Sequence, residues 1–103
     1  MRIALAQINP TLGDFEKNFQ KILDFIQRAH EKNCELVVFP ESSLFGYHPY
    51  DMLERPKIVQ RQESFLAKLH KQIPKDMGVL VGAFTKNPKE KGRPYFNSAV
   101  FLV

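Results

Sequence analysis

Apolar residues recur along the chain with two different spacings, and these spacings separate helices from strands. Between residues 15 and 26 they recur every three or four positions, which places them on one face of a helix. Asp14, just before this run, predicts the helix N-cap, and Asn33 predicts its end. The members of the apolar face are Phe15, Phe19, Ile22, Leu23 and Ile26.

A second helix is predicted between two prolines. Pro56 suits the first helical turn, where its missing N–H costs nothing, and Pro74 cannot continue a helix. Between them, a second apolar face is predicted for Ile58, Phe65, Leu66, Leu69 and Ile73.

Four shorter apolar runs predict strands, at residues 2–8, 36–39, 77–84 and 95–103. The run LVVF at 36–39 is continuous and rich in β-branched residues, which is typical of a strand covered on both faces. The polar stretch between the last two runs predicts a hairpin connection. The order β-α-β-α-β-β therefore predicts an α/β fold, in which helices pack on one face of a mixed sheet.

Composition limits the function classes that remain. The chain has 103 residues, of which 44% are hydrophobic and 25% charged, as expected for one globular domain. No apolar run is long enough to cross a membrane, and the N-terminus predicts a first strand and not a signal peptide. The net charge is +4, and the basic run TKNPKEKGRP predicts a solvated hairpin loop, so neither nucleic acid nor membrane is expected as a partner.

The single cysteine, Cys34, excludes an internal disulfide and suits a reducing cytosol, so a cytoplasmic location is expected. Cys34 stands seven residues before Glu41. At about 3.3 Å per strand residue the two are separated by roughly 23 Å, which is far beyond hydrogen-bond reach. Cys34 is therefore interpreted as a structural thiol. His48 and Asp51 are two potential ligands in one loop, too few for a zinc site, and no metal is expected.

The segment ELVVFPESSLFGYHPYD, residues 35–51, carries the most distinctive chemistry. Pro40 ends an apolar strand, and Glu41 follows it directly. A strand end is a stiff mount for a carboxylate, and a proline stops the ladder so that the next side chain can point into a cleft. From these residues alone, Glu41 is either a catalytic carboxylate or an ordinary one that is solvated or ion-paired.

Four segments together resemble the carbon–nitrogen hydrolase (nitrilase) family: MRIALAQINPTLGDFEKN, ELVVFPE, GYHPYDMLERP and NSAVFLV. The resemblance covers residues 1–103 as the N-terminal portion of one domain, and it implies part of an α-β-β-α sandwich. Residues 46–56 are most similar to the glutamine-hydrolysing domains of NAD synthetases. Ser42 and Ser43 depart from the family pattern, which has more apolar residues there, and His48 stands where this subfamily usually has proline.

The resemblance implies amide hydrolysis by a Glu–Lys–Cys triad. Glu41 matches the general base, and Tyr47 matches a tyrosine that lines the amide pocket. The lysine and cysteine have no matching positions and are expected beyond Val103, so the chain alone is expected to be inactive. No cofactor is expected in this chain, and ATP and Mg²⁺ are expected only in a separate synthetase domain.

The expected function is therefore the front part of a glutamine amidohydrolase domain that supplies ammonia for ATP-dependent NAD synthesis. One alternative keeps the family but is another amidase or a carbamoylase, so that the partner is glutamine or another small amide. A further alternative is a truncated, non-enzymatic association module. The apolar strand at 95–103 supports it, because that surface would have to be covered by a partner. The partners expected to cover this surface are the rest of the hydrolase domain or another copy of the chain.

Overall fold

The computed structural model describes residues 1–46, 50–89 and 91–103, and it has the predicted α/β order. The elements are β1 (Ile3–Leu5), α1 (Phe15–Glu31), β2 (Leu36–Val38), the 3₁₀ helix η1 (Tyr50–Glu54), α2 (Pro56–Gln72), β3 (Gly78–Lys86) and β4 (Tyr95–Leu102). Sequence patterns missed η1, and they predicted a longer first strand than the three residues of β1.

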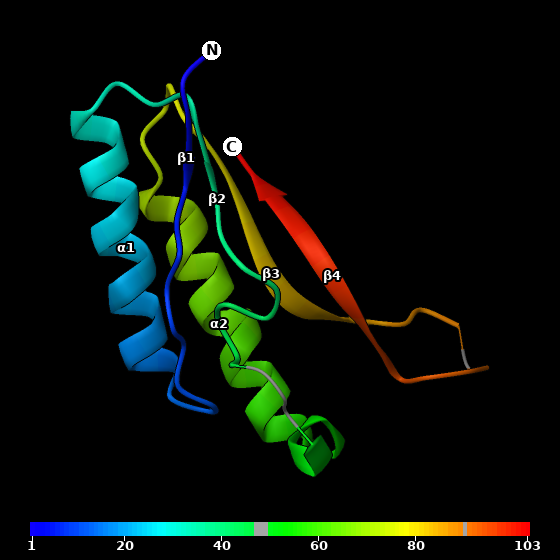
Figure 1. The fold of residues 1–103 in the computed structure, drawn as a ribbon. Coiled ribbons are helices and arrows are strands. Elements are labelled where there is room, and N and C mark those ends of the chain that lie inside the picture. The colour runs from blue at the N-terminus through cyan, green and yellow to red at the C-terminus, as the bar shows by residue number, and fades with distance from the viewer. Residues whose placement is uncertain (47–49, 90) are drawn as a thin grey trace.

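The four strands form one mixed sheet in the order β1-β2-β3-β4. β1, β2 and β3 run parallel, and β4 returns antiparallel beside β3, as the predicted hairpin requires. Figure 1 shows α1 and α2 side by side on one face of this sheet, and the tip of the β3–β4 hairpin extends away from both helices. The predicted packing of helices on one face is confirmed.

Helix α1 begins and ends where the sequence predicts. Asp14 is the N-cap, and its Oδ1 accepts a hydrogen bond from the Lys17 N–H at 3.1 Å. Asn33 follows the helix with a φ of 60°, a conformation that asparagine tolerates better than most residues. The predicted Leu23 is only half-buried, and the buried face consists of Phe15, Asn18, Phe19, Ile22, Ile26 and Ala29. Among these, the polar Asn18 was not predicted.

Helix α2 begins at Pro56 as predicted, but the centre of its buried face differs from the prediction. Its buried residues are Val59, Gln62, Phe65 and Leu69. The predicted Ile58, Leu66 and Ile73 are only half-buried, and Ile73 follows the last residue of the helix. The difference arises because Gln62, a polar residue, occupies the middle of the buried face and bonds to the backbone of β3. A search for apolar spacing alone cannot find such a position.

The other face of the sheet, here called the open face, is not covered by either helix. Leu36 and Val38 of β2 are half-buried, whereas Val37 between them is fully buried against the helices. β2 was predicted to be covered on both faces, but the described part of the chain covers only the face that carries Val37. Three large apolar side chains on this face, from the two outer strands β1 and β4, remain exposed: Ile3, Leu5 and Phe101. These three define the apolar patch of the open face.

Candidate active site

Glu41 lies just after β2, where the backbone crosses the open face over Gly82. A Cβ atom added at Gly82 would lie 2.6 Å from the carbonyl oxygen of Pro40 and 2.8 Å from the carbonyl carbon of Glu41. Only a residue without a side chain allows two backbones to approach this closely. The main chain that carries Glu41 therefore rests directly on β3, while the Glu41 side chain is exposed.

Beyond the end of β2, the edge of β3 forms hydrogen bonds with Phe39 and with the turn that begins at Glu41. The Phe39 N–H donates to the Leu80 carbonyl at 2.8 Å, and the Leu44 N–H donates to the Gly82 carbonyl at 3.4 Å. The Gly82 N–H donates to Ser43 Oγ at 3.2 Å. A serine hydroxyl thus replaces a strand carbonyl, because a buried N–H without a partner would be costly.

Ser42 and Ser43 are both completely buried, and each hydroxyl bonds to a backbone group, which gives a physical reason for polar residues at these positions. Ser42 has a φ of 54°, and its Oγ donates to the carbonyl oxygen of Gly46 at 2.9 Å. The Gly46 N–H in turn donates to the Ser42 carbonyl at 2.7 Å. These two bonds close the turn, so that Glu41 is attached to a compact, internally bonded segment.

Asn18 of α1 ties this turn to the rest of the domain. Its Nδ2 donates to the carbonyl oxygens of Thr11 at 2.8 Å and Leu44 at 2.9 Å, and its Oδ1 accepts from the Thr11 N–H at 2.7 Å. The side chain is fully buried. A third segment, the turn before α1, is also in contact, because the Gly13 N–H donates to the Phe45 carbonyl at 2.9 Å. The position of Glu41 is thus fixed from both the sheet and the helix layer.

Asn97 of β4 is the side chain that reaches Glu41. Its Nδ2 donates a hydrogen bond to Glu41 Oε1, joining residues that are 56 positions apart in the sequence. Asn97, Ala99 and Phe101 alternate along β4, and alternate residues of a strand share a face, so Asn97 lies on the open face. Sequence reasoning missed Asn97 as a site residue. The signal that could have found it is a polar residue on the outward-facing positions of an otherwise apolar strand.

A hollow of about 310 Å³ lies beside this pair. Pro40, Glu41, Gly82, Asn97 and Ala99 contribute to its wall. An exposed carboxylate on a rigid mount, at the edge of such a hollow, can accept a proton from a group that is placed against it. The geometry is thus compatible with acid–base chemistry on the open face.

The remaining sequence candidates divide into residues that the structure describes and residues that it does not. Tyr47 and His48 lie outside the described residues, as does the side chain of Asp51. Cys34 is buried at the start of β2, and Glu41 follows its end, so the two stand at opposite ends of the strand. Within the described ranges, no group of three or more metal-binding side chains comes together, and no helix is long and apolar enough to cross a membrane.

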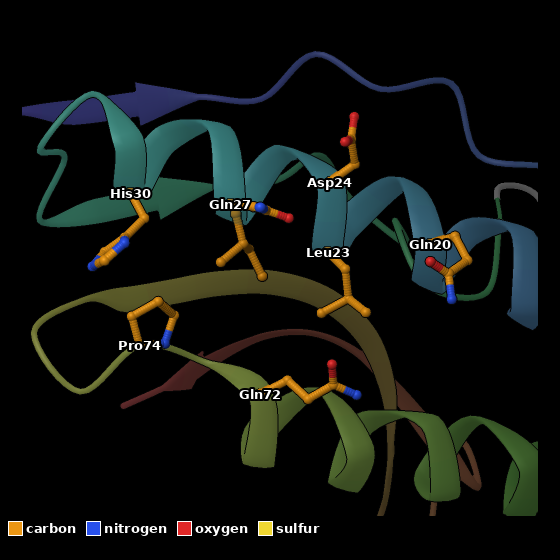
Figure 2. A pocket seen from close by; sticks show the side chains of 8 residues that line it. Gln20, Leu23, Asp24, Gln27, His30, Gln72 and Pro74 are labelled. Atoms are coloured by element: carbon orange, nitrogen blue, oxygen red, sulfur yellow. The ribbon is translucent and has the colours of Figure 1, made fainter.

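A second hollow, of about 370 Å³, lies on the helix side of the sheet, between α1 and the end of α2. Figure 2 shows Leu23, Gln27 and His30 of α1 facing Gln72 and Pro74 across it. His30 Nε2 lies 3.1 Å from Asp76 Oδ1, and both side chains are solvent-accessible. The residues that line this hollow do not include Glu41, so it is separate from the candidate active site.

Comparison with known proteins agrees with the fold and with the motifs around Glu41. The family model described as carbon–nitrogen hydrolase matches residues 2–103. The chain therefore belongs to the carbon–nitrogen hydrolase family, and the predicted resemblance is confirmed.

Within this family the chain is similar to glutamine-dependent NAD(+) synthetases. It is 35% identical to the enzyme of Synechocystis sp. over 97% of this chain and 18% of that protein. The structure of the Acinetobacter baumannii enzyme, in complex with ADP, aligns with a TM-score of 0.84 and 32% identity, over 97% of this chain and 18% of that one. The chain thus spans less than a fifth of the length of these relatives and matches their N-terminal part.

A smaller relative is an amidase from Nesterenkonia sp. AN1. One of its structures aligns with a TM-score of 0.69 and 25% identity, over 82% of this chain and 32% of that one. That structure is of a double mutant, in which a glutamate is changed to glutamine and a cysteine to alanine, in complex with acrylamide. The similarity therefore extends to family members that are not NAD synthetases.

Proposed function

We propose that this chain is the front part of a glutamine amidohydrolase domain that releases ammonia from glutamine for ATP-dependent NAD synthesis. The observation that carries the proposal is the position of Glu41 at the end of β2, on the open face and beside a hollow, in a chain that belongs to the carbon–nitrogen hydrolases. The similarity to glutamine-dependent NAD(+) synthetases over nearly the whole chain supports glutamine as the amide.

In this proposal Glu41 is the general base. A cysteine thiol has an ordinary pKa of about 8.5 and is mostly protonated at neutral pH, so it needs a base beside it. Glu41 takes the thiol proton, and the thiolate attacks the amide carbon. A lysine stabilises the oxyanion, ammonia leaves with the returned proton, and water then hydrolyses the thioester to release glutamate and the thiol.

The nucleophile and the lysine come from residues outside this chain. The only cysteine of the sequence is Cys34, which is buried at the far end of β2 from Glu41. The lysine and cysteine need to be held against the open face, because Glu41 and Asn97 are both there. We propose that the rest of the hydrolase domain supplies them and, in the same contact, covers the apolar patch formed by Ile3, Leu5 and Phe101.

Two further parts of the proposal concern binding. Tyr47 follows the turn that begins at Glu41, one residue after Gly46, and we assign it to the amide pocket. ATP and Mg²⁺ are assigned to a separate synthetase domain, because NAD synthesis needs an activated substrate and the chemistry described for Glu41 does not provide one. The 103-residue chain alone is expected to have no glutaminase activity.

The test is ammonia release from glutamine by the full-length protein that contains this chain. Glu41→Gln removes the base while keeping the size of the side chain, and we expect kcat to fall by at least about a thousandfold. The matched control is Glu35→Gln, which makes the same change at the exposed opposite end of β2 and should leave kcat unchanged.

The possible outcomes distinguish the proposed function from the alternative functions. Full activity in the Glu41→Gln protein would contradict the assigned base. Dependence on Glu41 combined with faster turnover of simple aliphatic amides or N-carbamoyl compounds than of glutamine would favour an amidase or a carbamoylase. Glutamine hydrolysis by the isolated 103-residue chain would contradict the assignment of the nucleophile to residues outside it.

A further inference from the structure

We infer that Asn97 is a positioning residue for Glu41: its side-chain amide holds one carboxylate oxygen, so that the other is presented to the group that Glu41 deprotonates. The inference rests on the proposed role of Glu41 as base. Asn97 lies on β4 and donates from Nδ2 to Glu41 Oε1. A carboxylate only accepts hydrogen bonds, so the donor end of the amide must face it.

The backbone that carries Asn97 is fixed independently of Glu41. Asn97 is paired with Phe84 in the β3–β4 ladder, which continues without interruption from Lys86 and Tyr95 to Val79 and Leu102. Phe84 is held from the other edge of β3 by Gln62, whose amide bonds to both its N–H and its carbonyl oxygen. Gln62 of α2 therefore fixes the β3 residue that lies directly opposite Asn97, and Asn97 in turn bonds to Glu41.

Glu41 needs such a partner because only its main chain is anchored. Gly82, Ser42 and Ser43 fix the backbone of the turn, but the Glu41 side chain is exposed. A free glutamate side chain populates several rotamers, and few of them direct an oxygen at one fixed point. Among the described residues, Asn97 provides the one hydrogen bond to this carboxylate. Restricting the rotamers should therefore accelerate the step in which Glu41 accepts a proton.

The test compares three side chains at position 97 in the full-length protein, with glutamine as the substrate. Asn97→Ala removes the donor, and we expect kcat to fall about 10- to 100-fold, the effect of losing a hydrogen bond to a charged group. Asn97→Asp has the same shape but places a second carboxylate against the first, and we expect a still larger fall. KM should change by less than about threefold for both, because Asn97 acts through Glu41 and does not touch the substrate.

The control for the charge change is Asn33→Asp. Asn33 lies at the opposite end of the sheet, and its positive φ is tolerated by aspartate as well as by asparagine. This variant should retain full activity. Equal losses in Asn97→Ala and Asn97→Asp, or a loss that appears in KM and not in kcat, would show a purely structural role and overturn the inference. Loss of activity in Glu41→Gln with full activity in both Asn97 variants would also overturn it, while leaving the proposed function intact.

A measurement without turnover tests the contact itself. In the ¹⁵N-labelled 103-residue chain, the side-chain NH₂ group of Asn97 should give two well-separated proton signals, with the hydrogen-bonded one exchanging slowly with water. Glu41→Ala should bring these signals together and accelerate exchange. The Asn87 side chain serves as an internal reference, because its Nδ2 bonds to the Lys91 and Arg93 carbonyls in the hairpin loop. Unchanged Asn97 signals in the Glu41→Ala chain would overturn the inference even if Glu41 is the base.

Discussion

Gln62 occupies the place of a neighbouring strand beside Phe84. Its Nε2 donates to the Phe84 carbonyl oxygen at 2.7 Å, and its Oε1 accepts from the Phe84 N–H at 2.9 Å. β2 ends at Val38, so this part of β3 has no strand on that side. A buried glutamine from the helix layer thus completes the edge of the sheet next to the candidate site.

Replacing Gln62 with leucine should destabilise the chain by about 2–4 kcal/mol, because it leaves a buried N–H and a buried carbonyl oxygen without partners. The free energy of unfolding, measured by urea denaturation, tests this expectation. Gln60→Leu is the matched control, since Gln60 is exposed on the same helix. Equal stability of the two variants would show that the Phe84 backbone finds other partners.

Gly82→Ala should destabilise the chain by about 2–3 kcal/mol, because the new methyl group would collide with the backbone at Pro40 and Glu41. In contrast, the new methyl group of Gly92→Ala meets only Asn87 Nδ2, at an ordinary contact distance of 4.0 Å, and the change should cost only about 1–2 kcal/mol, the penalty for alanine at a φ of 88°. Urea denaturation of both variants checks the order. If Gly82→Ala were the milder change, the close crossing of the two backbones would be wrong.

Asn18→Ala should loosen two turns at once. The variant loses three hydrogen bonds that connect α1 to Thr11 and Leu44, at a cost of about 2–4 kcal/mol. Hydrogen exchange of backbone amides should become faster at Thr11 and Gly13, and at Leu44 and Gly46. Gln20→Ala, at an exposed position of the same helix, should leave these rates unchanged. Faster exchange in the whole chain, with no preference for these turns, would contradict the local role.

The apolar patch of the open face should make the isolated chain self-associate. Ile3, Leu5 and Phe101 are exposed on one face of the sheet, on its two outer strands, and uncovered apolar side chains of this kind favour contact between copies. Sedimentation velocity should show a mass that rises with concentration, and Leu5→Thr with Phe101→Thr should reduce it. The control is Leu12→Thr, because Leu12 is exposed outside the sheet. A concentration-independent monomer before substitution would contradict the expectation.

Local patterns were sufficient for much of the fold. The N-cap at Asp14, the start of α2 at Pro56 and the hairpin between β3 and β4 were all predicted, because each depends on residues close in sequence. The sequence also placed Glu41 at the end of a strand, since Pro40 cannot continue the ladder. These features need no knowledge of tertiary contacts.

The supporting residues of the candidate site were not predicted, and the reason is the same for each. Asn18, Gln62 and Asn97 are polar residues within helices or strands, and each has a partner 22 or more positions away in the sequence. Periodicity treats such residues as interruptions of an apolar pattern. Only the three-dimensional arrangement shows that each one satisfies a specific donor or acceptor around the turn that carries Glu41.

The crossing of the Pro40–Glu41 backbone over Gly82 separates the placement of the carboxylate from the shape of the hollow beside it. The carboxylate is placed by main-chain contact, whereas part of the wall of the hollow is formed by side chains such as that of Ala99. Substitutions at Ala99 could therefore alter which molecules enter the hollow without displacing the carboxylate. Such a division would allow related proteins to diversify their substrates while keeping the same chemistry, as long as position 82 remains glycine.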